Sequence, residues 1–181
     1  MNERKLSEHH EQLSDGTRVL FRTLQPEDAS LYPDFLSNVT AEDLRLRFFG
    51  PMAQVSSQLI EKLTHFDHRR AMAFIAIDEA TGKMLGVVRL HDDPNGRSAE
   101  FAVLLRSRLK SRGLGWQLMR RMIEFAKDKR LETVHGQVLS ENTAMLKMCE
   151  ELGFHVDDDP DEHGVKRAVL KVTEAGTIPA P

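Results

Sequence analysis

The sequence predicts one α/β domain built on a mixed β-sheet, and three observations support this fold class. Segments rich in β-branched and aromatic residues alternate with segments of helical periodicity. Three consecutive strands lie between helical segments, whereas the last two strands are separated by a helix, so antiparallel and parallel neighbours are both expected. A chain of 181 residues with 40% hydrophobic content is long enough to bury one core.

The N-terminal half begins with a polar segment, residues 1–15, which predicts a flexible leader or a loosely docked segment. The turn at Asp15 and Gly16 then introduces the first strand, and Pro26 with the acids behind it predicts a helix start. A helix break is expected at Gly50, and Gly82 marks a hairpin between two strands. The expected elements of this half are a strand at 17–24, helices at 26–37, 41–49 and 55–66, and strands at 72–78 and 84–90.

The C-terminal half contains the clearest helical pattern of the chain. Apolar side chains repeat along one stripe from Leu114 through Leu118 and Met122 to Ala126, with charged residues opposite. Gly153 ends a second helix, and the acidic segment 157–162 is expected to be a solvated loop. The expected elements are a strand at 98–105, a helix from about 115, a strand at 133–139, a helix at 142–152 and a strand at 165–172, so the domain covers 16–173 and residues 174–181 form a flexible tail.

Charge and composition restrict the classes of partner. The 25 basic and 28 acidic residues give a net charge of −3, so we expect neither nucleic-acid nor membrane binding. The N-terminus lacks the apolar core of a signal peptide, and the single cysteine suits a reducing compartment, so the sequence predicts a cytoplasmic protein. The histidine and aspartate groups around residues 65–68 and 91–93 match no known zinc or calcium spacing, and no metal is expected.

A basic glycine loop at residues 110–115 separates the strand at 98–105 from the following helix. Amides in the first turn of a helix lack intrahelical acceptors, and glycines let an anion approach the main chain closely. Lys110 and Arg112 add positive charges to this loop, whereas Gly113 and Gly115 supply backbone freedom. The motif therefore predicts a phosphate site, although a G-x-G pair on its own is also compatible with a simple tight turn.

This order of elements resembles the GNAT superfamily of acyl-CoA-dependent N-acyltransferases over roughly residues 17–172. The loop at 110–115 is similar to the family's Q/R-x-x-G-x-G/A motif, with Lys110 in the place of Gln or Arg, and Asn142 with the segment 149–154 resembles a second family signature. The resemblance implies a mostly antiparallel central sheet of about six or seven strands between helices, in three layers, and acetyl-CoA as cosubstrate. The expected CoA-binding residues are Val103, Leu105, Lys110, Ser111, Arg112, Gly113, Leu114, Gly115, Trp116 and Asn142. Asn142 also suits a helix N-cap, and Trp116 also suits the core.

Within the superfamily the chain most resembles the Pat-type bacterial protein lysine acetyltransferases, through the segments 44–51, 63–68 and 99–102. In that branch a glutamate on the corresponding strand is the general base, and Glu100 occupies the matching position. A lysine amine has a pKa near ~10.4 and must lose a proton before it attacks a thioester, so the chemistry requires such a base. The alternative for Glu100 is an exposed strand charge paired with Arg97 or Arg106.

Cys149 stands where the family often has a tyrosine that protonates the departing thiolate. A thiol of ordinary pKa, about 8.5, could donate that proton, so Cys149 is a second candidate catalytic residue. The alternative is a buried thiol that only packs in the core.

The expected activity is transfer of acetyl from acetyl-CoA to a primary amine by direct attack in a ternary complex. The resemblance implies a protein lysine as acceptor, for example on an acyl-CoA synthetase, and leaves a homodimer open. Acetylation of a small amine or polyamine is one alternative, and a non-catalytic acyl-CoA-binding regulatory module is another.

Overall fold

One eight-stranded sheet runs through the part of the chain that the computed structural model describes, residues 8–50 and 56–173. Its strands lie in the order β1-β2-β3-β4-β5-β6-β8-β7, and every neighbouring pair is antiparallel except β5 and β6. The strands are β1 His9–Gln12, β2 Arg18–Thr23, β3 Ala71–Asp78, β4 Met84–Asp92, β5 Ser98–Leu105, β6 Thr133–Leu139, β7 His155–Asp158 and β8 Val165–Lys171. The mixed, mostly antiparallel sheet expected from the sequence is confirmed.

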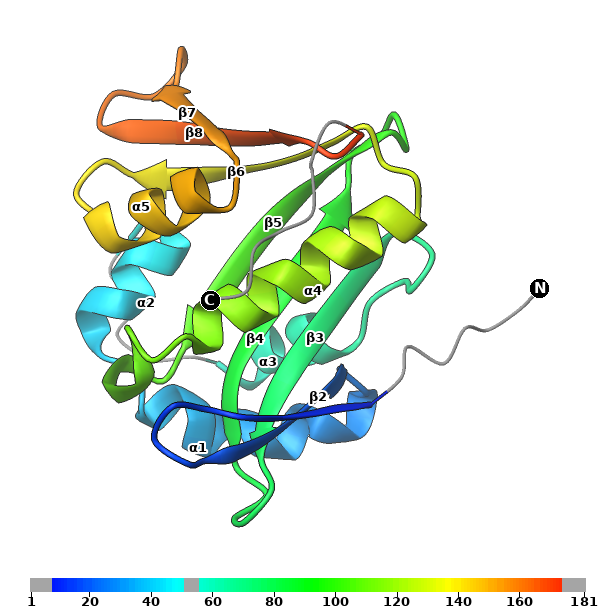
Figure 1. Cartoon of the computed structure of the whole chain (residues 1–181), viewed down its shortest axis with the longest axis vertical. Helices are drawn as coiled ribbons and strands as arrows, with labels where there is room; N and C mark the ends of the chain where they lie inside the picture. The colour runs from blue at the N-terminus through cyan, green and yellow to red at the C-terminus, as the bar shows by residue number, and fades with distance from the viewer. Residues whose placement is uncertain (1–7, 51–55, 174–181) are drawn as a thin grey trace.

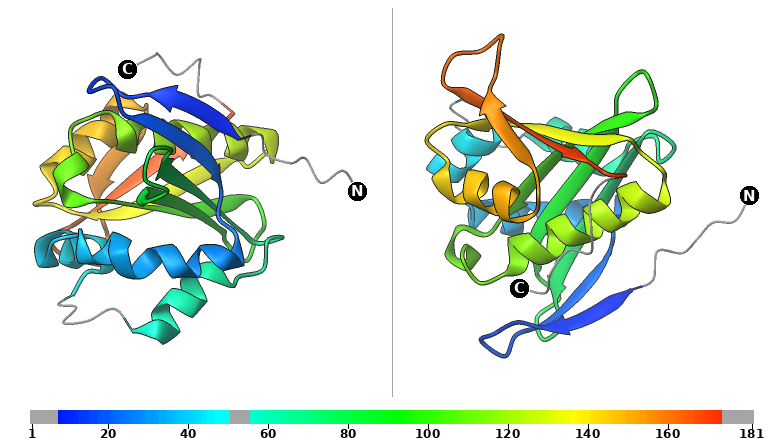
Figure 2. Two further views of the ribbon diagram at one scale, coloured as in Figure 1. Left: turned by 90° about the horizontal axis from the view of Figure 1, so that it is seen from below. Right: turned by 45° about the horizontal axis from the view of Figure 1, so that its top comes forward.

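Helices cover both faces of the sheet and give the molecule three layers (Figures 1 and 2). The helical elements are η1 Pro26–Leu31, α1 Tyr32–Ser37, α2 Ala41–Phe48, α3 Ser57–Thr64, η2 Ser107–Leu109, α4 Leu114–Asp128 and α5 Thr143–Glu151. The long helix α4 crosses one face, whereas α1, α2 and α3 cover the opposite face.

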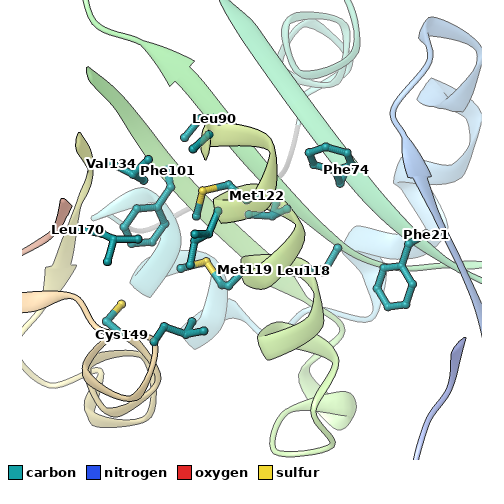
Figure 3. Packing of buried hydrophobic residues seen from close by; sticks show 14 of the residues in the cluster. Phe21, Phe74, Leu90, Phe101, Leu118, Met119, Met122, Val134, Cys149 and Leu170 are labelled. Carbon is teal, nitrogen blue, oxygen red and sulfur yellow. The ribbon is translucent and has the colours of Figure 1, made fainter. Parts of the chain in front are cut away.

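The larger core lies between the sheet and the α4 side (Figure 3). The stripe predicted for α4 is buried as expected, and Leu118 and Met122 have no exposed surface. Side chains from β5, β6 and β8 complete this cluster, and α5 contributes Cys149. A second cluster on the other face contains Tyr32, Phe35 and Leu104. Two cores, one on each face, hold the layers together.

Two short edge strands were not predicted. Residues 9–12, which we expected in a flexible leader or a loosely docked segment, form β1 and pair with β2. Glu11 in β1 also accepts hydrogen bonds from Arg120, at 3.3 Å, and Arg121, at 2.6 Å, so this polar strand is tied to α4. Of the two expectations for residues 1–15, the docked segment agrees with these four residues. Residues 1–7 and 174–181 lie outside the described part of the chain.

The acidic segment expected as a loop begins within β7. Asp157 and Asp158 stand opposite Arg167 and Lys166 on β8, and Lys166 Nζ lies 2.8 Å from Asp158. Cross-strand pairs of opposite charge stabilise a strand that has little apolar surface to bury. The sheet therefore has eight strands instead of the six or seven expected.

The helix expected at 26–37 divides into a 3-10 segment, η1, followed by α1. Pro33 lies at the start of α1, and proline has no backbone N–H to continue the hydrogen-bond ladder of a preceding helix. The change from 3-10 to α geometry at this point follows from that missing donor.

Gly136 on β6 generates a prediction about packing. A Cβ at this position would lie 2.6 Å from Cε1 of Phe101. We expect Gly136→Ala to lower the free energy of unfolding by about 1–3 kcal/mol, the usual cost of overpacking a core. Urea denaturation measures this cost. Gly50→Ala, where no atom of the described residues lies within 4 Å of the added Cβ, is the matched control and should change stability little. Equal stability of the two variants would contradict the packing argument.

Candidate active site

The site is a cavity that opens where β5 and β6 separate. These parallel strands pair at only three positions, Ser98 with Thr133, Ala99 with Val134 and Glu100 with His135. Beyond Glu100 the β6-facing edge of β5 has no strand partner among the described residues, whereas the other edge continues to pair with β4 as far as Leu105. The cavity has a volume of about 950 Å³ and is lined by β5, the loop at 110–115, α2 and α5.

Glu100 lies on the cavity wall with an exposed side chain. The two arginines considered as its alternative partners are used elsewhere, because Arg97 pairs with Glu132 and the buried Arg106 pairs with Asp34. No ion pair of Glu100 is present within the described residues. The carboxylate is therefore available to accept a proton from a molecule in the cavity.

The loop at 110–115 presents backbone amides, as its glycines predict. Ser111 and Gly113 both have positive φ, 65° and 83°, and Gly113 is the N-cap of α4. The first helical hydrogen bond of α4 runs from Gln117 N to Gly113 O, so the amides of Leu114, Gly115 and Trp116 have no acceptor among the described residues. This geometry, together with the positive end of the helix dipole, favours an anion.

Lys110 lies beside the cavity but already has an anionic partner. Its ammonium pairs with Asp43 on α2, and Asp43 also accepts a hydrogen bond from the Ser107 hydroxyl. Burial raises the pKa of the Asp43 carboxyl, but the hydrogen bonds from Lys110 and Ser107 outweigh it and the pKa lies below its usual value. This ion pair fixes the N-terminus of α2 against the glycine loop.

The remaining expected CoA-binding residues divide into two groups. Val103, Leu105, Ser111, Gly113, Gly115, Trp116 and Asn142 all line the cavity. Arg112 is not part of the lining and pairs with Asp15 at 2.6 Å, and the Leu114 side chain is fully buried in the core, so that only its backbone faces the loop.

Asn142 and Trp116 each have both of the roles that the sequence left open, a structural role and a position on the cavity wall. Asn142 is the N-cap of α5, with its Oδ1 accepting from Met145 N at 3.3 Å, and it also lines the cavity. Trp116 packs against the larger core and lines the cavity, and its buried Nε1 has no hydrogen-bond partner among the described residues.

Cys149 is placed in the core instead of the cavity. Its side chain is fully buried, beside Leu170 and Met119, and it does not line the cavity (Figure 3). Burial, with a smaller effect of Glu150, raises the pKa of the Cys149 thiol to about 12. This environment favours the packing role over the acid role.

Sequence reasoning gave no role to two cavity residues of α2, Asp43 and Arg47. The segment that contains Arg47 was noted only for its resemblance to one enzyme branch. Within the described residues no group of three or more histidine, cysteine, aspartate or glutamate side chains is arranged to hold a metal ion, and no helix there is long and apolar enough to cross a membrane.

Comparison with known proteins agrees with this architecture. The chain is 29% identical to acetyltransferase PA5475 of Pseudomonas aeruginosa over 154 residues, 84% of this chain and 83% of that protein. The GNAT domain of S. lividans PAT superposes with a TM-score of 0.83 at 23% identity, over 91% of this chain and 96% of that one. Spermidine N-acetyltransferase of Vibrio cholerae, solved with CoA and spermine, gives a TM-score of 0.69 at 20% identity, over 87% of this chain and 97% of that one.

The family model for the acetyltransferase (GNAT) domain matches residues 18–155, which is most of the chain. The chain therefore belongs to the GNAT family of N-acetyltransferases.

Proposed function

We propose that this chain transfers acetyl from acetyl-CoA to the side-chain amine of a protein lysine. The observation that carries the proposal is a single cavity that contains both an unpaired carboxylate, Glu100, and the anion-binding loop at 110–115. Similarity to the S. lividans PAT domain supports a protein acceptor, and a cytoplasmic location remains part of the proposal.

The cavity suits CoA because its wall offers different groups to a ligand from one end of β5 to the other. The loop amides suit a diphosphate, and the unpaired edge of β5 near Val103 and Leu105 suits the amides of a pantetheine arm. Glu100 lies five residues before Leu105, about 16 Å along an extended strand, so the carboxylate lies at the opposite end from the loop.

The chemistry follows from this placement. Glu100, directly or through water, accepts a proton from the ammonium of the acceptor, and the neutral amine nitrogen then attacks the thioester carbonyl. A C–N bond forms, the C–S bond breaks, and the thiolate leaves with the electron pair. The extra proton that the nitrogen carries after the attack passes to the thiolate or to water, which leaves a neutral amide. A backbone amide of β5 beside the carbonyl would stabilise the negative charge that develops on its oxygen.

The direct test is isothermal titration with acetyl-CoA followed by a mass-spectrometric screen of lysine peptides, intact acyl-CoA synthetases and free polyamines. Binding of acetyl-CoA with acetylation of peptide or protein lysines is the expected result. Acetylation of polyamines alone would reject the protein acceptor, and no binding of any CoA thioester would reject the site.

Glu100→Gln tests the general base. We expect turnover to fall by about 10²-fold or more, the scale of general-base catalysis, whereas the affinity for acetyl-CoA stays unchanged. The deficit should narrow as the pH approaches ~10, because the amine then loses its proton without help. Glu132→Gln, which removes a carboxylate outside the cavity, is the control. Loss of acetyl-CoA binding with full turnover at saturation would disprove the role.

Cys149→Ala tests the proton donor. Because the thiol is buried in the core and its pKa is raised, we expect turnover to stay within about twofold. Loss of the sulfur should lower the free energy of unfolding by about 1 kcal/mol or more, the scale for deleting one buried group. Steady-state kinetics and urea denaturation on the same preparation give both values. A tenfold fall in turnover at unchanged stability would restore the acid role.

A further inference from the structure

Arg47 has a position in the cavity that the reaction described so far does not use. It lies on α2, half-buried, and lines the cavity together with Glu100 and Ala102. Because α2 is anchored at its N-terminus by the pair between Asp43 and Lys110, the helix leads away from the glycine loop. Arg47 lies one helical turn after Asp43 and is close enough to Glu100 for the two charges to interact, so we place it at the carboxylate end of the cavity.

The Arg47 guanidinium lacks an anionic partner within the described residues. The guanidinium lies over an aromatic ring, with Cζ 4.7 Å from the centre of the Phe48 ring. A guanidinium that stacks on a ring keeps its N–H groups available at its edges. Residues 51–55, which follow this part of the chain, contain no acidic side chain.

Neighbouring arginines differ from Arg47 in this respect. Arg45, on the same helix, pairs with Glu42 at 2.7 Å and with Glu141 at 2.9 Å. Arg89 on β4 donates to the Tyr32 hydroxyl at 2.9 Å and to the Leu63 carbonyl. Arg47 is thus the cavity arginine with donors left for a ligand.

The electrostatic environment makes this free charge costly. Burial and the neighbouring Arg89 lower the pKa of Arg47 to about 10, and Glu100 only partly opposes them. Arg89 stands opposite Ala102 in the β4–β5 ladder, and Ala102 is two residues from Glu100 on the same face of β5. A carboxylate bound between these groups would relieve the repulsion between the two guanidinium groups.

We propose that Arg47 is a specificity-determining residue that pairs with a carboxylate carried by the acceptor close to its reactive amine. This inference rests on the proposed function and makes the preferred acceptor a lysine with an acidic neighbour in the protein sequence. The amine is directed to Glu100, and the adjacent carboxylate is directed to Arg47. A polyamine has no such group and would bring a second positive charge against Arg47.

The experiment compares two peptides that differ only beside the lysine, one with Glu and one with Gln on either side. We expect the native enzyme to favour the Glu peptide by about tenfold or more in kcat/KM, mainly through KM. Arg47→Gln should remove this preference and leave the acetyl-CoA affinity unchanged, whereas Arg47→Glu should reverse it toward a Lys-flanked peptide. Arg45→Gln, which removes a charge from the same helix outside the cavity lining, should keep the preference.

Three results would overturn the proposal. One is an equal kcat/KM for the two peptides in the native enzyme, and another is a preference that survives in Arg47→Gln. The third concerns the donor: if Arg47→Gln loses affinity for acetyl-CoA, or loses activity only when succinyl-CoA is the donor, then Arg47 binds the donor and not the acceptor. Circular dichroism of each variant verifies that it folds.

A second assay with two small amines, 6-aminohexanoate and its amide, tests the role of Arg47 independently of the proposal that the acceptor is a protein. If no peptide is acetylated but 6-aminohexanoate is preferred over its amide in an Arg47-dependent way, then the carboxylate site stands and the protein acceptor fails. If peptides are acetylated without regard to flanking charge, then the protein acceptor stands and the role of Arg47 fails.

Discussion

The divergence of β5 from β6 is the constraint on which the rest of the structure depends. Each strand is held along its whole length by its other neighbour, β5 by β4 and β6 by β8, so the two halves of the sheet cannot close the gap between them. Unpaired backbone N–H and C=O groups in the middle of a sheet would cost free energy if they were buried away from water. Here these groups of β5 border a cavity instead. A ligand rich in amides can complete the sheet at this edge, which makes binding a property of the scaffold and not of mobile loops.

The register of β5 decides which residues face the chemistry. Because side chains alternate across a strand, Ala99 and Phe101 enter the core beneath α4, whereas Glu100 and Ala102 face the α2 side and the cavity. A slip of one residue would bury the carboxylate and expose Phe101. The ring of Phe101 fits only because Gly136 on β6 has no side chain, so the position of Glu100 depends on a packing contact on the other face of the sheet.

The sequence alone predicted the interior strands, the long helices and the glycine loop, because each has a strong local signal: an apolar run, a helical stripe or positive-φ glycines. It missed β1 and β7, since polar four-residue edge strands are stabilised by ladder hydrogen bonds and cross-strand charge pairs that leave no hydrophobic pattern. It placed Glu100 in the site through family resemblance. It could not identify Arg47, whose significance is that it has no anionic ion-pair partner among the described residues, a property that exists only once α2, β4 and β5 have been brought together.

Charge placement explains why the loop tolerates Lys110 at a position where related loops have Gln or Arg. Lys110 is neutralised by Asp43 and Arg112 by Asp15, so the positive field at the loop comes largely from the unpaired amides before and within the first turn of α4. The Lys110 side chain then serves a second purpose, because its pair with Asp43 connects the glycine loop to α2. Because α2 also carries Arg47, this ion pair ties the glycine loop to the helix that holds the residue proposed to bind the acceptor. One helix therefore connects the two ends of the cavity, so the distance between the glycine loop and Arg47 is set by the fold and not by a mobile loop.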